Sequence, residues 1–268
     1  MIPAKFDYLR PGSLDEAVHV LGNAGDDAKV IAGGQSLMPL LRLRLAQPEL
    51  LVDVGGLDEL RGVRDQGDSL VIGARTTLYQ LVNDPLVAEH CGLLAQAAAT
   101  VADPAGDLPA VMLALEATLT ARGPGGERQI PAADFFVDYL TSHLAPDEIL
   151  TAIRIPKLGD GWGFRYEKFH RTAQAWATVG VAALVRRSNG SVAEARIGLT
   201  NMGTTPLRAT AAEDAAAGAE ATRDALRAAA SRADEGTNPP ADLHGAADYR
   251  RHLARVLTGR ALAAAAGA

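Results

Sequence analysis

The amino-acid sequence predicts an α+β fold in two modules, and three observations support this. An N-terminal stretch alternates helix and buried-strand patterns, which is typical of a small α/β unit with parallel strands. A central stretch mixes short helices with a predicted hairpin. Near residues 158–161 the composition shifts to longer strands, a hairpin turn and an alanine-rich helical tail. The predicted domains are therefore residues 1–158 and 161–268.

The N-terminal unit begins with a predicted helix. Ser13-Leu14-Asp15-Glu16 is a capping box, because the Glu stands three residues after the Ser. Apolar residues follow at helical spacing, and Gly22 and Gly25 mark the end of the helix. Buried strands are then predicted at Val30-Ile31 and over residues 50–54.

Between these strands, residues 32–37 (Ala-Gly-Gly-Gln-Ser-Leu) join the first strand to a second helix. Adjacent glycines adopt conformations closed to other residues and let a ligand approach the bare backbone. Consecutive N–H groups of such a turn, followed by those of a helix start, form a concavity that binds anions such as a diphosphate. A plain turn has the same pattern, so both interpretations stay open on this motif alone.

The rest of the chain predicts short helices, antiparallel strands and a helical tail. Asn189-Gly190 is the strongest two-residue hairpin signal. The predicted strands are residues 69–74, 118–121, 128–130, 148–155, 164–169, 179–187 and 193–200. The predicted helices are a short one capped by Thr77, then residues 85–101 and 105–114, an exposed helix over 211–230 and a final helix over 248–266.

Bulk composition excludes several classes of function. A net charge of −6 over 268 residues disfavours electrostatic attraction to nucleic acid or an anionic membrane. No apolar run approaches the roughly 18 residues that span a bilayer, and the first residues lack signal-peptide features, so we expect a cytoplasmic protein without a membrane span.

Cys91 is the only cysteine, which excludes an internal disulfide and disfavours a Cys-ligated cluster; we expect it to be buried. The six histidines show no ligand spacing, so no metal site is predicted.

A series of short motifs occurs in a fixed order along nearly the whole chain. They are Phe6-Asp7-Tyr8 and residues 13–17, 32–37, 103–110, 133–136, 148–151, 167–171, 198–203 and 249–254. Together they resemble the medium, flavin-carrying subunit of the carbon monoxide dehydrogenase and xanthine dehydrogenase family of molybdenum hydroxylases. Because the match rests on many motifs in one order, it is far more specific than any single motif.

This resemblance implies both a fold and a function. The fold is a two-subdomain FAD-binding module of the vanillyl-alcohol-oxidase (PCMH) type, followed by a C-terminal domain of antiparallel strands and helices. The function is FAD-dependent electron transfer, from iron–sulfur clusters to an external acceptor, with no catalytic residue for substrate in this chain. The implied partners are a small 2Fe-2S subunit and a large molybdopterin subunit, assembled as a dimer of heterotrimers.

The resemblance also assigns cofactor-binding residues. Asp107 touches the adenosine half of FAD, and Lys168 and Trp176 lie near the isoalloxazine. A cation at Lys168 stabilises the reduced flavin, whereas the alternative interpretation is a surface lysine on a strand. The backbone that holds the diphosphate is that of Ala32, Gly33, Gly34, Gln35, Ser36 and Leu37.

One departure from the family pattern affects FAD affinity. Members carry a second glycine loop, Arg-Asn-x-Gly-Thr-Ile-Gly-Gly-x-Leu-Ala, which is absent here near residues 101–105. Without this loop, FAD loses two or three charge-assisted hydrogen bonds of about 1.5–3 kcal/mol each. This loss corresponds to an increase of about two to six powers of ten in the dissociation constant. We therefore predict that FAD binds weakly or only within the complex.

Two other functions remain open at this point. The missing loop favours a flavin-free docking or scaffold subunit of the same kind of complex. A stand-alone flavin oxidase requires a substrate pocket and acid–base residues, which the sequence does not reveal.

Overall fold

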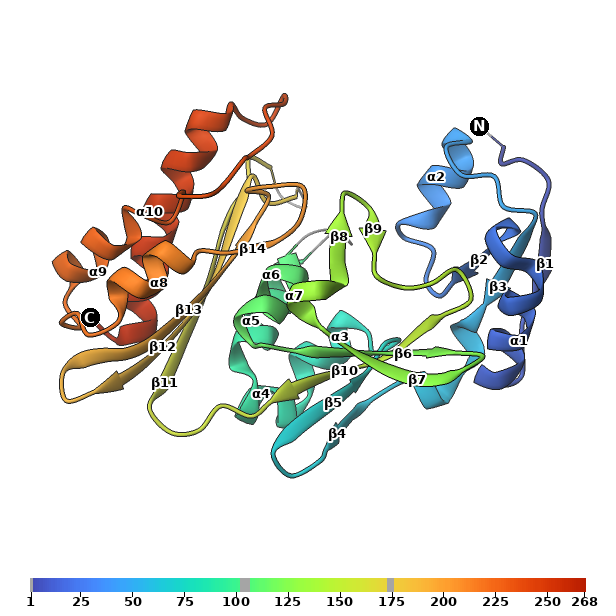
Figure 1. Ribbon diagram of the computed structural model, residues 1–268, viewed down its shortest axis with the longest axis horizontal. Helices are drawn as coiled ribbons and strands as arrows, with labels where there is room; N and C mark the ends of the chain where they lie inside the picture. Colours follow the sequence, from blue (N-terminus) through green and yellow to red (C-terminus); the bar gives the residue numbers. More distant parts are fainter. Residues whose placement is uncertain (1, 102–106, 173–175) are drawn as a thin grey trace.

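The computed structural model describes residues 2–101, 107–172 and 176–268 and consists of three units in a row (Figure 1). The first unit lies at one end, the central unit follows, and the unit that contains the C-terminus lies at the other end. Each unit has its own sheet, and a small hairpin makes a further two-stranded sheet in the central unit. None of the helices within these described ranges is long and apolar enough to cross a membrane.

The first unit is a three-stranded parallel sheet in the order β1-β3-β2, which confirms the predicted parallel pair and adds β1. The Ser13 side chain accepts a hydrogen bond from the Glu16 N–H at 3.2 Å, which confirms the serine half of the predicted capping box. The Glu16 carboxylate accepts from the Gly12 N–H at 2.7 Å instead of from that of Ser13. Short 3-10 turns follow α1 and β3. The elements are β1 (Asp7–Leu9), α1 (Leu14–Ala24), β2 (Ala28–Ile31), α2 (Leu37–Leu43) and β3 (Leu50–Asp53).

The central unit is a five-stranded antiparallel sheet in the order β4-β5-β10-β6-β7. The predicted hairpin of β6 and β7 is confirmed, as is the Thr77 cap of α3. The strands are β4 (Val63–Asp65), β5 (Ser69–Gly73), β6 (Thr118–Gly123), β7 (Gly126–Pro131), β8 (Phe136–Asp138), β9 (Thr141–Ser142) and β10 (Ile149–Pro156). The helices are α3 (Leu78–Asn83), α4 (Pro85–His90), α5 (Gly92–Thr100), α6 (Asp107–Ala114) and α7 (Ala132–Phe135).

The single helix predicted over residues 85–101 is wrong, because the chain forms α4 and α5 with a break at Cys91. Gly92 starts the second helix against the Phe164 ring, and a Cβ on Gly92 would lie 2.2 Å from Phe164 Cζ. The break thus brings the helix backbone onto the neighbouring sheet. Cys91 itself is buried as expected, and burial raises the pKa of its thiol to about 12.

The third unit is a four-stranded antiparallel sheet in the order β11-β12-β13-β14 with three helices. Asn189 (φ 51°) and Gly190 (φ 81°) form the predicted turn between β12 and β13. The exposed helix predicted over residues 211–230 is wrong: α8 and α9 are separate, α8 buries alanine side chains, and α9 buries Leu226 with two alanines. The elements are β11 (Trp162–Phe169), β12 (Val179–Ser188), β13 (Ser191–Thr200), β14 (Leu207–Arg208), α8 (Thr210–Ala216), α9 (Arg223–Ala230) and α10 (Ala247–Ala266).

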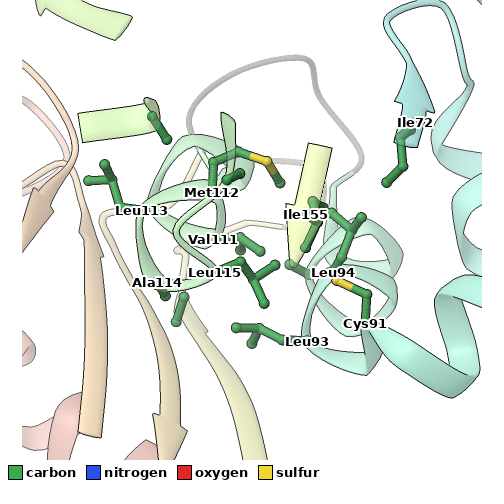
Figure 2. Packing of buried hydrophobic residues seen from close by; sticks show 14 of the residues in the cluster. Ile72, Cys91, Leu93, Leu94, Val111, Met112, Leu113, Ala114, Leu115 and Ile155 are labelled. Atoms are coloured by element: carbon green, nitrogen blue, oxygen red, sulfur yellow. The ribbon is translucent and has the colours of Figure 1, made fainter. Parts of the chain in front are cut away.

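The described residues form three hydrophobic clusters. One lies between α1 and the parallel sheet of the first unit and extends to Ile149 of β10. A second fills the space between the central sheet and its helices and continues to Tyr166 and Leu184 of the third sheet. Figure 2 shows its middle, where side chains of α5 and α6 meet Ile72 and Ile155 of the central sheet. The third lies between the opposite face of the third sheet and helices α8–α10. The central helices are therefore a layer between two sheets.

Helix α6 approaches the third sheet closely at Gly198. A Cβ on Gly198 would lie 2.0 Å from the Ala110 carbonyl oxygen of α6, a distance that side chains do not reach. The absence of a side chain at this position therefore sets how the central unit docks on the third unit.

We expect Gly198→Ala to lower the free energy of unfolding by about 1–3 kcal/mol, because the new methyl group must push α6 off the sheet. Chemical denaturation monitored by circular dichroism measures the change. Gly159→Ala is the matched control, since a Cβ there meets no atom within 4 Å. Equal stability of the two variants would contradict the close docking of α6.

Candidate functional site

The glycine loop (residues 32–37) leaves β2 at the edge where the parallel strands end. Its conformation depends on Gly34, which has φ +80° and whose added Cβ would lie 2.8 Å from Met38 Cγ. The Gly34 carbonyl accepts a hydrogen bond from the Met38 N–H at 2.8 Å. Ser36 precedes α2 in a helical conformation, and its side chain makes no capping hydrogen bond. The sharp turn therefore comes from the glycine, not from a serine cap.

Across the described ranges, none of the N–H groups of residues 33–37 donates a hydrogen bond. The loop is at the surface and borders an open hollow that Met38 and Arg42 also line. Free N–H groups at a bare, accessible turn can bind the oxygens of an anionic ligand.

A buried ion pair joins the central unit to the third unit. Lys168 Nζ on β11 lies 2.6 Å from Asp107 Oδ2 at the start of α6, with the two side chains 6% and 1% exposed. The Lys168 ammonium also donates to the Thr100 carbonyl oxygen at 3.3 Å, at the end of α5. Lys168 is therefore not the surface lysine of the alternative interpretation.

Tyr166 completes this buried cluster. Its hydroxyl lies near the Asp107 carboxylate and the Thr200 side chain. Burial, followed by the charge of Asp107, raises the pKa of the Tyr166 phenol well above its ordinary value. Within the described chain, neither Asp107 Oδ1 nor the Tyr166 hydroxyl makes a hydrogen bond of good geometry, although both are buried. The cluster therefore has unused acceptor capacity at Asp107.

Trp176 is 57% exposed and precedes β12. The residues after it are held from two sides. Asn201, in a left-handed conformation (φ 62°), donates through Nδ2 to the Ala177 carbonyl oxygen at 3.1 Å. The fully buried Arg250 donates to the Thr178 carbonyl oxygen and is also paired with Asp242. The backbone at Trp176 is thus anchored while its ring remains accessible.

The predicted site residues fall into three groups. The glycine loop is in the first unit, Asp107 and Lys168 meet where the central and third units join, and Trp176 is in the third unit. The first and third units lie on either side of the central unit (Figure 1), so only an elongated ligand can contact the glycine loop and Lys168 together. The junction near residues 101–105, where the second glycine loop is missing, lies mostly outside the described residues.

Sequence reasoning missed the contact between Asp107 and Lys168 and the role of Tyr166. The sequence did contain a signal for Tyr166. Alternate residues of a strand point to the same face, and Tyr166 is two residues before Lys168 on the predicted strand. The contact bears on the assignments inferred from the resemblance. An extended FAD holds its adenosine and isoalloxazine halves far apart, so a single half would have to contact both Asp107 and Lys168, which lie 2.6 Å from each other.

Two family models match the two halves of the chain. Residues 4–158 match the family described as the FAD binding domain in molybdopterin dehydrogenase, and residues 164–265 match the CO dehydrogenase flavoprotein C-terminal domain. These matches define the class: a flavoprotein-type subunit of a molybdenum-containing dehydrogenase.

Individual relatives are similar over their full length. The carbon monoxide dehydrogenase medium chain of Hydrogenophaga pseudoflava is 40% identical over 282 aligned positions, covering 99% of this chain and 98% of the relative. The structure of reconstituted CO dehydrogenase from Oligotropha carboxidovorans matches with a TM-score of 0.96 and 37% identity, covering 100% of this chain and 99% of that one. Quinoline 2-oxidoreductase from Pseudomonas putida 86 matches with a TM-score of 0.93 and 32% identity, covering 100% and 99%. The chain belongs to the family of FAD-binding medium subunits of molybdenum hydroxylases, which are subunits of oxidoreductases.

We expect Lys168→Met to lower the free energy of unfolding by about 3–5 kcal/mol, because it leaves the Asp107 carboxylate buried without its counter-ion. The double variant Lys168→Met with Asp107→Leu should recover most of the loss, since both charges are removed. Chemical denaturation measures the free energy of unfolding of the single and double variants. Arg232→Met, which breaks an exposed pair with Glu235, is the control and should leave stability unchanged. A double variant no more stable than the single one would show that the charge pair is not the cause.

The raised pKa of Tyr166 predicts how stability changes in alkali. In the unfolded chain a tyrosine ionises near its ordinary pKa of 10.0, whereas native Tyr166 stays protonated to higher pH. The unfolded state therefore releases a proton first, so the stability from Tyr166 is complete below pH 10 and is lost as the pH rises above it. Thermal melts between pH 8 and about 11.5 should show a shallower alkaline decline for Tyr166→Phe. The control Tyr79→Phe, at an exposed position, should follow the wild type. If the melting temperatures of the wild type, Tyr166→Phe and Tyr79→Phe fall equally in alkali, Tyr166 is not the group responsible.

Proposed function

We propose that this chain is the electron-transfer subunit of a molybdenum hydroxylase complex, with FAD as its cofactor. The observation that carries the proposal is the glycine loop, whose free N–H groups fit a diphosphate in a chain of the FAD-binding family. The proposed cofactor-binding residues are those of the glycine loop together with Asp107, Lys168 and Trp176. When bound, the flavin would accept electrons from sister subunits and pass them to an external acceptor.

The glycine loop would hold the diphosphate through its backbone. Its N–H groups are fixed before binding because Gly34 and the Gly34–Met38 hydrogen bond define the turn. Pre-organised donors lose little entropy when the anion arrives, which favours affinity. No charged side chain is needed for this contact, since the amides themselves provide the positive ends of peptide dipoles.

Asp107 and Lys168 would contact the flavin half of the cofactor. Asp107 Oδ1 is an acceptor without a partner within the described chain, which fits a hydroxyl group of the ribityl chain. Lys168 would place positive charge near the isoalloxazine and so favour the reduced form. Because Asp107 fixes the lysine at 2.6 Å, the charge is positioned before the cofactor binds. Trp176, anchored by its neighbours and exposed, is available to pack on the ring.

The proposed partners are a small 2Fe-2S subunit and a large molybdopterin subunit, arranged as a dimer of heterotrimers. The full-length similarity to the medium chain of carbon monoxide dehydrogenase supports this arrangement. The matched proteins include CO dehydrogenases and a quinoline oxidoreductase on the same fold, so the substrate is determined outside this chain.

A flavin-free docking subunit is the second candidate, and a specific observation favours it. The match to the Hydrogenophaga medium chain extends over 282 positions, more than the 268 residues of this chain, so the relative has residues without a counterpart here. The family's second glycine loop is absent from the sequence, and its hydrogen bonds to the diphosphate are absent with it. Such a chain would keep the subunit interfaces and lose the cofactor.

Titration with FAD, followed by quenching of flavin fluorescence, separates the candidates. We expect weak binding by the isolated chain and tighter binding by the assembled complex. Inserting the loop Arg-Asn-x-Gly-Thr-Ile-Gly-Gly-x-Leu-Ala between Val101 and Ala102 should raise the affinity by about 100-fold or more, since it restores two or three charge-assisted hydrogen bonds. A Gly-Ser insert of equal length is the control.

Dye reduction by the complex provides the functional test. Under the proposed function, the rate with substrate depends on added FAD. Stoichiometric FAD in the purified isolated chain would contradict weak binding. If neither chain nor complex binds FAD and the dye is still reduced, the flavin-free docking subunit is correct.

A further inference from the structure

A groove lies between helices α9 and α10 of the third unit, at the opposite end of the molecule from the glycine loop (Figure 1). Its volume is about 730 Å³. We call it the α9–α10 groove, and its lining carries five basic side chains: Arg223, Arg227, His252, Arg255 and Arg260. Neither the glycine loop nor the pair of Asp107 and Lys168 is part of it.

Most of these cations have no counter-charge. Arg227 and Arg260 make no ion pair or hydrogen bond with any described residue, and Arg223 donates only to a backbone carbonyl oxygen at 3.2 Å. Arg255 is the exception, because it is paired with Asp234 at 2.6 Å. No aspartate or glutamate is among the described residues that line the groove, although the chain has 32 acidic against 26 basic side chains. The groove is therefore a local positive surface on an acidic protein, and it is complementary to a negatively charged partner.

The shape of the groove favours an elongated occupant. Its lining residues on α10 run from His252 to Ala264, which is roughly 18 Å along a helix. The arginines form a row on each helix, since Arg223 and Arg227 are one turn apart on α9 and Arg255 and Arg260 follow each other on α10. An occupant that meets both rows carries several separated negative charges.

Between the two rows of cations the floor is apolar and shallow-walled. Val256, Gly259 and Ala264 line it, and none of them has a polar side-chain atom. Small side chains let a polypeptide backbone approach closely, and apolar atoms gain free energy when a ligand covers them. An occupant with apolar groups as well as negative charges therefore uses the whole surface.

Other anions fit these features less well. A nucleotide base is usually held by stacking on an aromatic ring, and no aromatic residue is among the described residues of the lining. Inorganic phosphates have no apolar group to cover the floor, and a flat bilayer surface cannot enter a groove. In a two-fold dimer the groove would meet its own copy, so like charges would gather at the contact.

We propose that the α9–α10 groove binds a polypeptide segment of a partner protein, in which aspartate or glutamate residues flank apolar side chains. The carboxylates of this segment pair with Arg223, Arg227 and Arg260, and its apolar side chains cover the floor at Val256 and Ala264. Arginine suits this contact because its planar guanidinium binds a carboxylate through two parallel hydrogen bonds. The inference does not rest on the proposed function, because the groove contains none of the proposed cofactor-binding residues.

Fluorescence anisotropy of the full chain with a labelled peptide, Glu-Glu-Leu-Glu-Glu-Leu-Glu-Glu, tests the charge contacts. We expect saturable binding at physiological ionic strength. Arg227→Glu should weaken it by about tenfold, and the double variant Arg227→Glu with Arg260→Glu should abolish it, because each reversal replaces an attraction by a repulsion. Arg64→Glu on β4 is the matched control: it makes the same charge change at an exposed arginine outside the groove and should bind as the wild type does.

A second variant tests the apolar floor. Val256→Ser should weaken binding of the leucine-containing peptide on the order of fivefold, since it removes apolar contact area. It should leave binding of the same peptide with serine in place of leucine unchanged. Circular dichroism verifies that each variant keeps its fold, and FAD titration should give the same affinity for all of them.

Several results would overturn the inference. They are an absence of peptide binding by the wild type, equal binding by the double variant, and equal loss in Arg64→Glu. Displacement of the peptide by tripolyphosphate at lower concentration would make the groove a phosphate site. Cosedimentation with phosphatidylserine vesicles, or a wild-type dimer in analytical ultracentrifugation, would assign it to a membrane or to a second copy if the double variant abolished either. A changed FAD affinity in the groove variants would place the groove in the cofactor site. A failure of FAD to bind at all contradicts only the proposed function.

Discussion

The buried pair of Asp107 and Lys168 is the interaction on which the arrangement of the site depends. It connects the first residue of α6 to β11, and the Thr100 carbonyl oxygen adds a contact from the end of α5. A charge pair taken out of water is stable only when both members stay in place. The pair therefore fixes the position of the central helices relative to the third sheet. It also holds the Lys168 ammonium at the boundary between the central and third units.

Close packing of α6 on the third sheet also stabilises the junction between the central and third units. Gly198 lets the helix backbone lie directly on β13, and Gly92 lets α5 start against the Phe164 ring. Apolar packing continues across the junction, since Tyr166 and Leu184 of the third sheet belong to the central cluster. The ion pair, the close backbone contacts and the apolar packing thus all stabilise the boundary between the central and third units. The described cluster of the first unit reaches the central unit only at Ile149 of β10, and its glycine loop remains open to solvent.

Local patterns predicted most of the fold, and the errors have physical causes. Ser13, Thr77 and Asn189-Gly190 act through neighbours in sequence, so their caps and turn could be read directly. The break lies at Cys91, where Gly92 starts α5 against the Phe164 ring, and this contact between distant residues is not visible in the apolar pattern of residues 85–101. The long helix expected over residues 211–230 was wrong because α8 ends at Ala216 and the chain turns at Gly218 (φ 79°) before Thr222 caps α9. In the site, the glycine loop was predicted from its sequence, whereas the Asp107–Lys168 contact depends on tertiary packing.

The three separate hydrophobic clusters bear on how this lineage could tolerate a lost segment. Helix α5 ends at Thr100 and helix α6 begins at Asp107, so the glycine loop that the sequence lacks would lie between two helices and outside the described strands. The loss of such a loop would remove ligand contacts and leave the three described apolar clusters intact. Folding and cofactor retention can therefore diverge independently during evolution. A protein of this architecture can persist as a well-folded member of its assembly even after its prosthetic group has become optional.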